Sequence, residues 1–219
     1  DARGVQFTLQ TELDPRPVMP EIIVGGGAAI DFDDDGWMDL YLLQASGEGG
    51  NRLLRNRGDG TFEDVTEGSG AGDIGYASGV ATGDIDGDGD VDLFISNLDA
   101  DVLLRNDGGG HFTDITDQSD VGDDGWGTST TFFDADADGD LDLYVVNAGP
   151  SEERSANALY RNNGTGSFTH VTQDAGVGDN GQGMAVTFGD YDNDDDIDLY
   201  VTNHGPNVLY RNNADGTFT

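Results

Sequence analysis

Four stretches of the chain alternate apolar and polar residues with a period of two, and Gly, Asn or Asp residues bound each of them. Leu141, Leu143 and Val145 show this spacing in the third stretch, and Leu199 and Val201 show it in the fourth. Such runs, rich in β-branched and aromatic residues, are typical of β-strands. No run has the spacing and length of a helix of about ten residues. The pattern therefore predicts an all-β protein.

The predicted strands recur as four copies of one unit, aligned on a first loop aspartate at Asp31, Asp84, Asp134 and Asp190. These aspartates are 53, 50 and 56 residues apart. Each unit predicts a strand before the aspartate loop, one after it, one at LLRN or LYRN, and one at F-x-D-V/I-T. A four-stranded unit repeated at this interval is typical of a propeller blade. We therefore predict a β-propeller built of four-stranded antiparallel blades, with four repeats present.

The repeats divide a single propeller region, residues 1–219, into blades at 26–72, 76–122, 126–178 and 182–219, the last strand of the fourth blade being incomplete. Residues 1–17 are predicted to add an N-terminal strand, because QFTLQTE at 6–12 resembles the last strand of a unit. Three arrangements remain open. The chain forms a closed four-bladed ring completed by the N-terminal strand, it is part of a larger propeller, or it exchanges strands between copies and builds a filament.

Each unit carries an aspartate loop of the form D-x-D-x-D-(G/D)-x-x-D. Alternate carboxylates on a tight loop converge on one centre, and oxygen ligands at this density select calcium, which accepts about six to eight of them. We expect one Ca²⁺ per unit, about four in all, with a backbone carbonyl contributed at position 7. The predicted metal ligands are Asp31, Asp33, Asp35, Trp37, Asp39, Asp84, Asp86, Asp88, Asp90, Asp92, Asp134, Asp136, Asp138, Asp140, Asp142, Asp190, Asp192, Asp194, Asp196 and Asp198.

The spacing argues against an EF-hand, which needs a bidentate Glu at position 12 of its loop. The residues at position 12 here are Leu42, Ile95, Val145 and Val201. The fourth loop departs from the pattern, because Asp195 replaces the Gly found at position 6 of the other three. Asp adopts a positive φ less readily than Gly. We therefore expect the fourth site to form but to bind its ion more weakly.

The composition is strongly acidic, with 44 acidic residues against 9 basic ones, all of them Arg, and a net charge of −35. A field this negative repels nucleic acids and anionic membranes. The chain has no Lys and no Cys, which excludes a catalytic lysine, a disulfide framework and a thiolate metal site. No run of about 18 apolar residues is present, so we expect no membrane span.

Two recurring motifs are assigned structural roles. The arginines of the L-x-R-N segments occur once per blade, and we expect each to pair with an aspartate; they are Arg55, Arg105, Arg161 and Arg211. The tripeptide at residues 57–59 spells the adhesion sequence RGD, but it falls in a predicted hairpin turn. Recognition by an adhesion receptor is therefore not assigned to it.

The segments VTFGDYDNDDDIDLYVTN and LYRNNADGTFT resemble FG-GAP/VCBS repeats, the calcium-binding blades also found in integrin α-chain heads. The N-terminal stretch GVQF…MPEIIVGGGAAIDFDDDGWMDLYLL resembles more specifically the cartilage acidic protein-like (ASPIC/UnbV-type) propeller proteins. The resemblance implies a secreted, calcium-loaded β-propeller, usually of seven blades. This chain departs from it by containing four.

The leading functional hypothesis is an extracellular or cell-surface calcium-binding scaffold, for adhesion or for protein binding, with a periplasmic location as an alternative. A second hypothesis is a carbohydrate-binding propeller that uses aromatic residues such as Trp37, Trp126 and Tyr76. An enzyme that cleaves glycosides with paired carboxylates is the least favoured, because metal loops account for the clustered carboxylates. We therefore expect no enzyme, a protein or glycan ligand, no nucleic-acid partner, and self-association if strands are exchanged.

Overall fold

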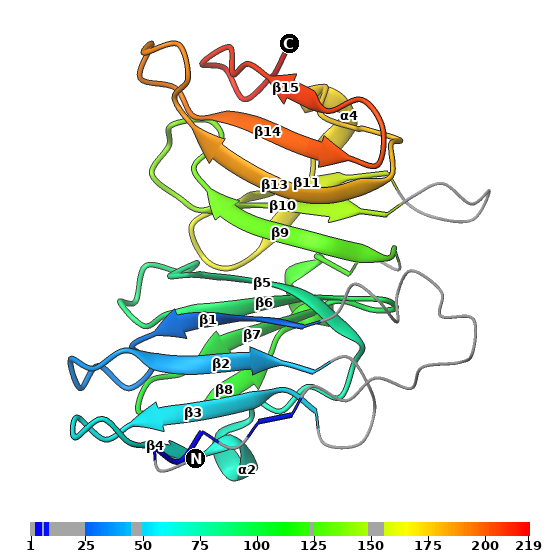
Figure 1. Ribbon diagram of the computed structural model, residues 1–219. Coiled ribbons are helices and arrows are strands. Elements are labelled where there is room, and N and C mark those ends of the chain that lie inside the picture. The colour runs from blue at the N-terminus through cyan, green and yellow to red at the C-terminus, as the bar shows by residue number, and fades with distance from the viewer. Residues whose placement is uncertain (1–2, 6, 9–24, 45–49, 123–124, 149–155) are drawn as a thin grey trace, which may run out of the picture.

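The computed structural model describes residues 3–5, 7–8, 25–44, 50–122, 125–148 and 156–219. Within these residues the chain forms fifteen strands in four antiparallel sheets, which confirms the predicted all-β class (Figure 1). Strands that follow one another in the chain are neighbours in each sheet, so every sheet is a meander. This is the arrangement of propeller blades.

Three blades have four strands each. The first contains β1 (Gly26–Ile30), β2 (Asp39–Leu43), β3 (Arg52–Asn56) and β4 (Phe62–Asp64). The second contains β5 (Ala77–Gly83), β6 (Asp92–Asn97), β7 (Val102–Asn106) and β8 (Phe112–Asp114). The third contains β9 (Gly127–Phe133), β10 (Asp142–Asn147), β11 (Ala158–Asn162) and β12 (Phe168–His170).

The fourth blade has three strands, β13 (Gly183–Gly189), β14 (Asp198–Asn203) and β15 (Val208–Tyr210). An isolated bridge between Asn212 and Phe218 lies where the other blades have their fourth strand. Three single-turn helices follow the outer strands of the first three blades, namely α2 (Thr66–Ser69), α3 (Thr116–Ser119) and α4 (Thr172–Ala175). Of these, α2 is irregular, with non-helical backbone angles at Glu67 and Gly68. The apolar pattern did not predict these helices, because one turn is too short to show a period of 3.6 residues.

Apolar side chains fill the three junctions between successive blades. At the third junction Tyr144 and Leu159 of one blade pack with Leu199 and Val201 of the next. Both faces of β6 and β10 are therefore covered, and all residues of these two strands are buried. Burial on both faces explains why their sequences read as short apolar blocks as well as alternating runs.

The four blades form an open row, with the first blade at one end and the fourth at the other (Figure 1). The closed four-bladed ring considered from the sequence is not observed among the described strands. Most of the predicted strand at residues 6–12 lies outside the described residues. Near it, the Phe62 N–H donates to the Arg3 carbonyl at 2.8 Å. Residue 3 therefore lies beside β4 of the first blade and away from the fourth.

Candidate metal centres

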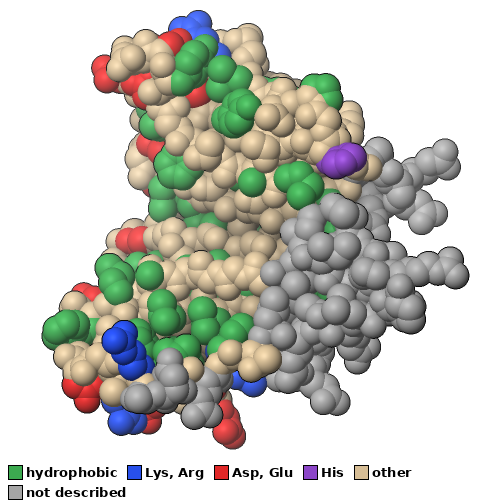
Figure 2. Space-filling model, viewed as in Figure 1, with side chains coloured by type: hydrophobic (Ala, Val, Ile, Leu, Met, Phe, Trp, Pro, Cys, Tyr) green, Lys and Arg blue, Asp and Glu red, His purple; other side chains and the backbone are tan. Residues whose placement is uncertain are grey.

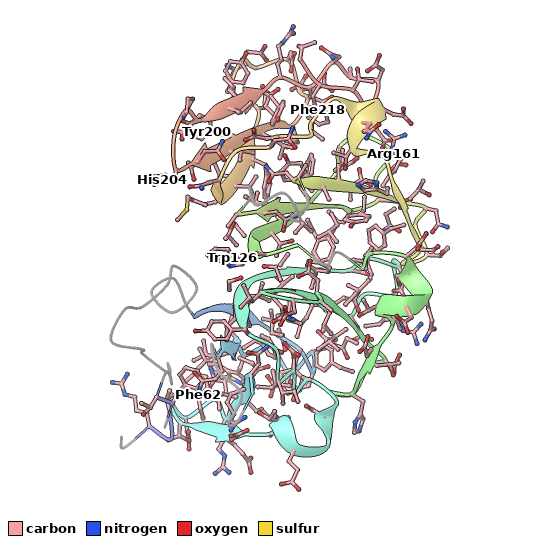
Figure 3. The ribbon with its side chains drawn as sticks, turned by 90° about the vertical axis from the view of Figure 1, so that its right-hand side faces the viewer. Phe62, Trp126, Arg161, Tyr200, His204 and Phe218 are labelled. Atoms are coloured by element: carbon pink, nitrogen blue, oxygen red, sulfur yellow. The ribbon has the colours of Figure 1, made fainter. Side chains whose placement is uncertain are left out.

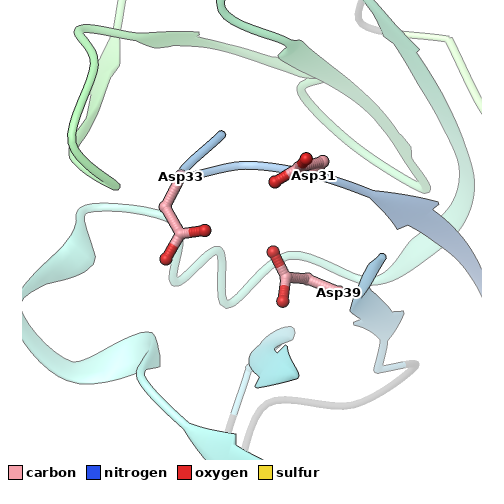
Figure 4. A group of neighbouring side chains, drawn as sticks. All are labelled: Asp31, Asp33 and Asp39. Atoms are coloured by element: carbon pink, nitrogen blue, oxygen red, sulfur yellow. The ribbon is translucent and has the colours of Figure 1, made fainter. Parts of the chain in front are cut away.

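In each of the four aspartate loops, three carboxylates offer oxygens that all lie within 4.8 Å of one another. In the first loop these belong to Asp31, Asp33 and Asp39, whose carboxylates point toward a common centre in Figure 4. The second and third loops use the same positions, 1, 3 and 9. In the fourth loop the group is Asp190, Asp192 and Asp194, at positions 1, 3 and 5.

The carboxylate of the first aspartate in each loop accepts backbone N–H groups from later residues of the same loop, which stabilises the turn. The Asp31 carboxylate accepts the N–H of Asp35 at 3.1 Å and that of Gly36 at 3.0 Å. Position 6 has a positive φ in every loop, between 73° at Asp195 and 97° at Gly89, which explains the Gly expected there. Asp195 adopts the conformation as well, so the fourth loop does form.

Position 4 also has a positive φ in every loop, which the sequence analysis missed. The residues concerned are Asp34, Gly87, Ala137 and Asn193. Asp, Gly and Asn tolerate the left-handed region, so three of the four copies carried a signal. Ala137 carried none, because Ala has no side chain that favours this conformation.

The last aspartate of each loop is buried and joins the loop to the third strand of its own blade. Asp142 is 1 % exposed, and its two carboxylate oxygens accept the N–H of Ala135 at 2.9 Å and of Asn162 at 2.8 Å. The other three loops repeat both bonds with position-9 carboxylates that are at most 1 % exposed.

Burial controls the ionisation of these carboxylates. It raises the pKa of Asp92 and of Asp142 from the usual 3.8 to about 7, although the two backbone N–H bonds to each act in the opposite direction. Burial also raises the pKa of Asp39, and neighbouring loop carboxylates add to the rise in all three. A buried carboxylate in this setting favours a bound cation, because the cation offsets the cost of its charge.

The position-3 carboxylates carry the observation that points most directly to a ligand. One oxygen of Asp33, of Asp86 and of Asp136 is buried and has no hydrogen-bond partner among the described residues. A buried, unpartnered carboxylate oxygen costs several kcal/mol unless something satisfies it. Each of these oxygens belongs to a group of three converging carboxylates. The first three loops therefore fit a divalent cation that prefers oxygen ligands.

All four L-x-R-N arginines pair with an aspartate, as expected, and in three of them the partner is the position-3 aspartate of the loop. Arg55 lies 2.7 Å from Asp33, and Arg161 lies 2.9 Å from Asp136. In the second blade Arg105 pairs instead with Asp107 of the hairpin, at 2.6 Å. The pairing is thus with an aspartate in every blade, but with a different one in the second.

The fourth loop differs from the others in its exposure and in its arginine. All three members of its carboxylate group are exposed. Arg211 reaches two of them, Asp192 at 2.7 Å and Asp194 at 2.8 Å. An arginine that engages two members of the three-carboxylate group competes with a cation for both. Arg55 engages one member of its group, Asp33, and its second partner, Asp35 at 3.4 Å, lies outside the group. Weaker binding at the fourth site stays a prediction.

The remaining predicted ligands lie in the loops but outside the three-carboxylate groups. Position 5 of the first three loops, at Asp35, Asp88 and Asp138, accepts the N–H of the residue at position 7. Position 9 of the fourth loop, Asp198, is buried, and its carboxylate accepts the N–H of Tyr191 and of Asn212; we call this pair of bonds, present in all four loops, the position-9 clamp. The carbonyl ligands expected at position 7, from Trp37, Asp90, Asp140 and Asp196, stay predictions.

An asparagine that the sequence analysis passed over links each of the first three loops to the next blade. The Asn162 side chain donates to the Ile85 carbonyl, in the loop of the preceding blade, at 2.8 Å. Asn106 and Asn212 make the same bond to Phe32 and Ala135, both at 2.9 Å. The signal was present, because this Asn follows the L-x-R arginine in every repeat.

The RGD tripeptide lies in the β3–β4 hairpin, as the turn prediction required. Arg57 pairs with Glu63 at 3.0 Å, and the Asp59 carboxylate accepts both the N–H and the hydroxyl of Thr61. Gly58 packs under the Trp37 ring, where a Cβ would lie 2.8 Å from the indole nitrogen. These contacts account for all three residues as parts of the turn.

Comparison of the chain with known protein families supports the repeats and the loops independently. The model of the FG-GAP-like repeat matches residues 31–95, 84–145 and 145–201, which together include all four aspartate loops. This chain belongs to the FG-GAP-like repeat family. Its blades and its aspartate loops are therefore those of an FG-GAP propeller. No curated protein sequence matches the chain.

Two solved structures are similar to this FG-GAP chain. A lectin from Agrocybe aegerita that recognises non-reducing terminal N-acetylglucosamine is 19% identical over 91% of the chain, with a TM-score of 0.53. The chain spans 52% of that lectin. The V. cholerae biofilm matrix protein Bap1 is 18% identical over 80% of the chain and 23% of its own length, with a TM-score of 0.44. Among the described residues, no helix is long and apolar enough to cross a membrane.

Proposed function

We propose that this FG-GAP chain is a calcium-binding propeller module that acts as a structural, adhesion or protein-binding scaffold outside the cell or at its surface. The observation that carries the proposal is the buried, unpartnered oxygen at position 3 of the first three loops, at Asp33, Asp86 and Asp136. All surrounding donors are carboxylate oxygens, which suit Ca²⁺ and suit Zn²⁺ poorly. The secreted location rests on the family resemblance together with the weak affinities that suffice for extracellular calcium sites, about 10⁻⁴ to 10⁻³ M.

Calcium in these loops would have a structural role. The position-9 aspartate is held by the second residue of its loop and by the third strand, so an ion bound to it would hold both together. It would also reduce the repulsion between loop carboxylates. At a free concentration tenfold above Kd, each ion adds about 1.4 kcal/mol to the free energy of unfolding.

The test is calorimetric titration of the chelator-treated chain with Ca²⁺ and with Mg²⁺, together with thermal melts. We expect three similar Ca²⁺ sites, a weaker fourth, a higher Tm with Ca²⁺, and a much smaller response to Mg²⁺. Asp136→Asn should remove one of the three sites. Asp117→Asn, an exposed carboxylate of α3 outside the loops, is the matched control and should leave all of them. If calorimetry detects no heat of Ca²⁺ binding and Ca²⁺ leaves Tm unchanged, the proposal is overturned.

We assign a binding role and no catalytic one, because metal coordination accounts for the clustered carboxylates. Within the FG-GAP family, the N-terminal stretch supports membership of the cartilage acidic protein-like group, and we propose that assignment as well. Much of that stretch, residues 9–24, lies outside the described residues. Its support is therefore the sequence alone.

A second candidate function is glycan binding, which one cleft favours. The cleft has a volume of about 750 Å³ and lies at the outer edge of the third blade, lined in part by Tyr160, His170 and Gln173. The Tyr160 and His170 rings are 5.1 Å apart, and amide side chains such as Asn180 offer polar partners for sugar hydroxyls. The similar fold of a GlcNAc-binding lectin supports the idea. A glycan array probed with the calcium-loaded chain tests it, and a blank array would remove it.

A further inference from the structure

The arginines of the L-x-R-N segments are positive charges that already hold the carboxylates a metal ion needs. In the third blade, Arg161 Nε lies 2.9 Å from the position-3 carboxylate of Asp136. In the first blade, Arg55 holds Asp33 in the same way, at 2.7 Å. Figure 2 shows arginine side chains beside acidic ones at both ends of the row. A divalent cation must displace such an arginine or share a ligand with it, and the repulsion between the two lowers its affinity.

Arg161 is also held by the blade that follows it. In Figure 3 it lies close to the C-terminal segment that carries Phe218, and its guanidinium donates to the Gly216 carbonyl of that segment at 3.4 Å. The side chains of Arg161 and Asp136 are 35% and 16% exposed, so water screens their ion pair only in part. The third loop therefore has an arginine at the place where an ion would bind.

In the second blade a hairpin aspartate draws the arginine away from the loop. Arg105 Nε and Nη2 both donate to one carboxylate oxygen of Asp107, at 2.9 and 2.6 Å. The Thr113 hydroxyl donates to the other oxygen of Asp107 and so fixes its orientation. Among the described residues, the position-3 aspartate of this loop, Asp86, has no ion pair, and one of its oxygens is buried without a hydrogen-bond partner. The carboxylate of Asp86 is therefore left for an ion.

One residue of the hairpin accounts for this difference between the blades. The residues equivalent to Asp107 in the other three hairpins are Arg57, Asn163 and Asn213. None of them carries a negative charge, so none offers a guanidinium a charged partner that competes with the loop.

The second and third loops are otherwise closely matched. Both have aspartates at positions 1, 3, 5, 7 and 9, and in both the three-carboxylate group uses positions 1, 3 and 9. Each belongs to a blade with a described blade on either side, so the two loops are compared in the same setting. They differ at position 4, where Ala137 replaces Gly87, and in the partner of their arginine.

We propose that Asp107 is a positioning residue that keeps Arg105 away from Asp86 and thereby makes the second loop the tightest calcium site, the first of the four to fill. This inference rests on the calcium binding proposed above. The second loop has one more uncompensated negative charge than the third, because its arginine is neutralised by a residue outside the loop. The difference in Kd is about two- to fivefold, the size that one partly exposed ion pair supports, and calorimetry alone would still show three similar sites.

A titration that resolves the individual loops tests this order. Gly89 and Gly139 occupy position 6 of the second and third loops, and their N–H groups donate to the first aspartate of the same loop at 2.9 and 3.0 Å. Their ¹⁵N NMR signals report on each loop separately as Ca²⁺ is added to the chelator-treated chain. We expect the Gly89 signal to reach its midpoint at about two- to fivefold less Ca²⁺ than the Gly139 signal. Equal midpoints would overturn this inference alone, whereas a chain in which no loop signal moves would overturn calcium binding itself.

Substitution of Asp107 separates its effect on Arg105 from the effect of its charge. Asp107→Asn should raise the Gly89 midpoint about two- to fivefold, because Arg105 then turns to Asp86. Loss of a negative charge near the loop would by itself weaken cation binding, so the same substitution is also made in an Arg105→Gln chain. There it should change the Gly89 midpoint much less, since no arginine remains to be redirected. Equal effects of Asp107→Asn with and without Arg105 would overturn the inference.

Removal of the arginine in the third blade is the converse test, and it also separates the arginine from the difference at position 4. Arg161→Gln should lower the Gly139 midpoint about two- to fivefold and bring it close to that of Gly89. Asp117→Asn, at an exposed carboxylate of α3 in the second blade, is the control for a lost surface charge and should leave both midpoints unchanged. A Gly139 midpoint that stays the same in Arg161→Gln would show that the arginine does not compete with the ion, and would overturn the inference.

Discussion

Removing the position-9 carboxylate of the third loop tests whether these aspartates clamp the fold independently of any ion. In Asp142→Ala, the N–H groups of Ala135 and Asn162 lose their acceptors at 2.9 and 2.8 Å. Both residues are buried, at 1% and 3% exposure. A buried N–H left without an acceptor costs about 1–3 kcal/mol, so we expect a loss near 4 kcal/mol for the two. For a chain of this size that loss lowers Tm by about 8–16 °C.

The measurement is a thermal melt in excess chelator, where the metal cannot contribute, repeated in excess Ca²⁺. The matched control is Asp140→Ala, which removes the same charge from the same loop. Among the described residues no backbone N–H donates to the Asp140 side chain, so we expect a change in Tm of a few degrees at most. Equal melts for Asp142→Ala and Asp140→Ala in chelator would refute the clamp. A larger loss for Asp142→Ala in Ca²⁺ than in chelator would measure its additional part in binding.

Two further predictions concern pH and the blade junctions. Because burial raises the pKa of Asp92 and Asp142 to about 7, the folded state holds protons that the unfolded state releases near pH 3.8. The contribution of these two groups to stability is therefore present below about pH 4 and lost as pH rises to about 7. Urea midpoints in chelator should show this loss, and it should be smaller in Asp142→Asn; an unchanged slope in the variant contradicts the assignment. Gly183→Ala should cost about 1–3 kcal/mol, because its Cβ would press on Val146 and lie 2.8 Å from the Asn147 carbonyl. Gly189→Ala, in open space on the same strand, should change the urea midpoint little, and equal effects would argue against a tight junction.

The blades and the loops were predictable because the sequence repeats them. Four copies in register turn a short alternating pattern into a reliable strand signal, and four Asp loops turn a common turn composition into a metal motif. The single-turn helices were not predictable from the apolar pattern. They depend on one threonine hydroxyl per turn, such as Thr172, which accepts the Leu159 N–H at 2.8 Å.

Differences between the four sites were harder to predict than the sites themselves. Asp195 identified the fourth loop as different from the other three. The exposure of that loop's carboxylates depends on what covers the blade, which the local sequence does not encode. Arg105 resembles the other three arginines in sequence and still pairs with Asp107, because that aspartate stands where the other hairpins have Arg or Asn. Whether Arg105 pairs with Asp107 or with the position-3 aspartate Asp86 depends on the distances between them in the folded blade, which the sequence does not contain.

The asparagines that link successive blades connect each aspartate loop to the loop of the neighbouring blade through hydrogen bonds. The backbone of Asn162 is held by Asp142 of its own loop, and its side chain holds the Ile85 carbonyl of the loop before it. Filling one loop therefore orders a residue that the neighbouring loop also needs. Linear arrays with such nearest-neighbour coupling respond cooperatively. Ion binding along this row should accordingly spread from blade to blade through Asn106, Asn162 and Asn212.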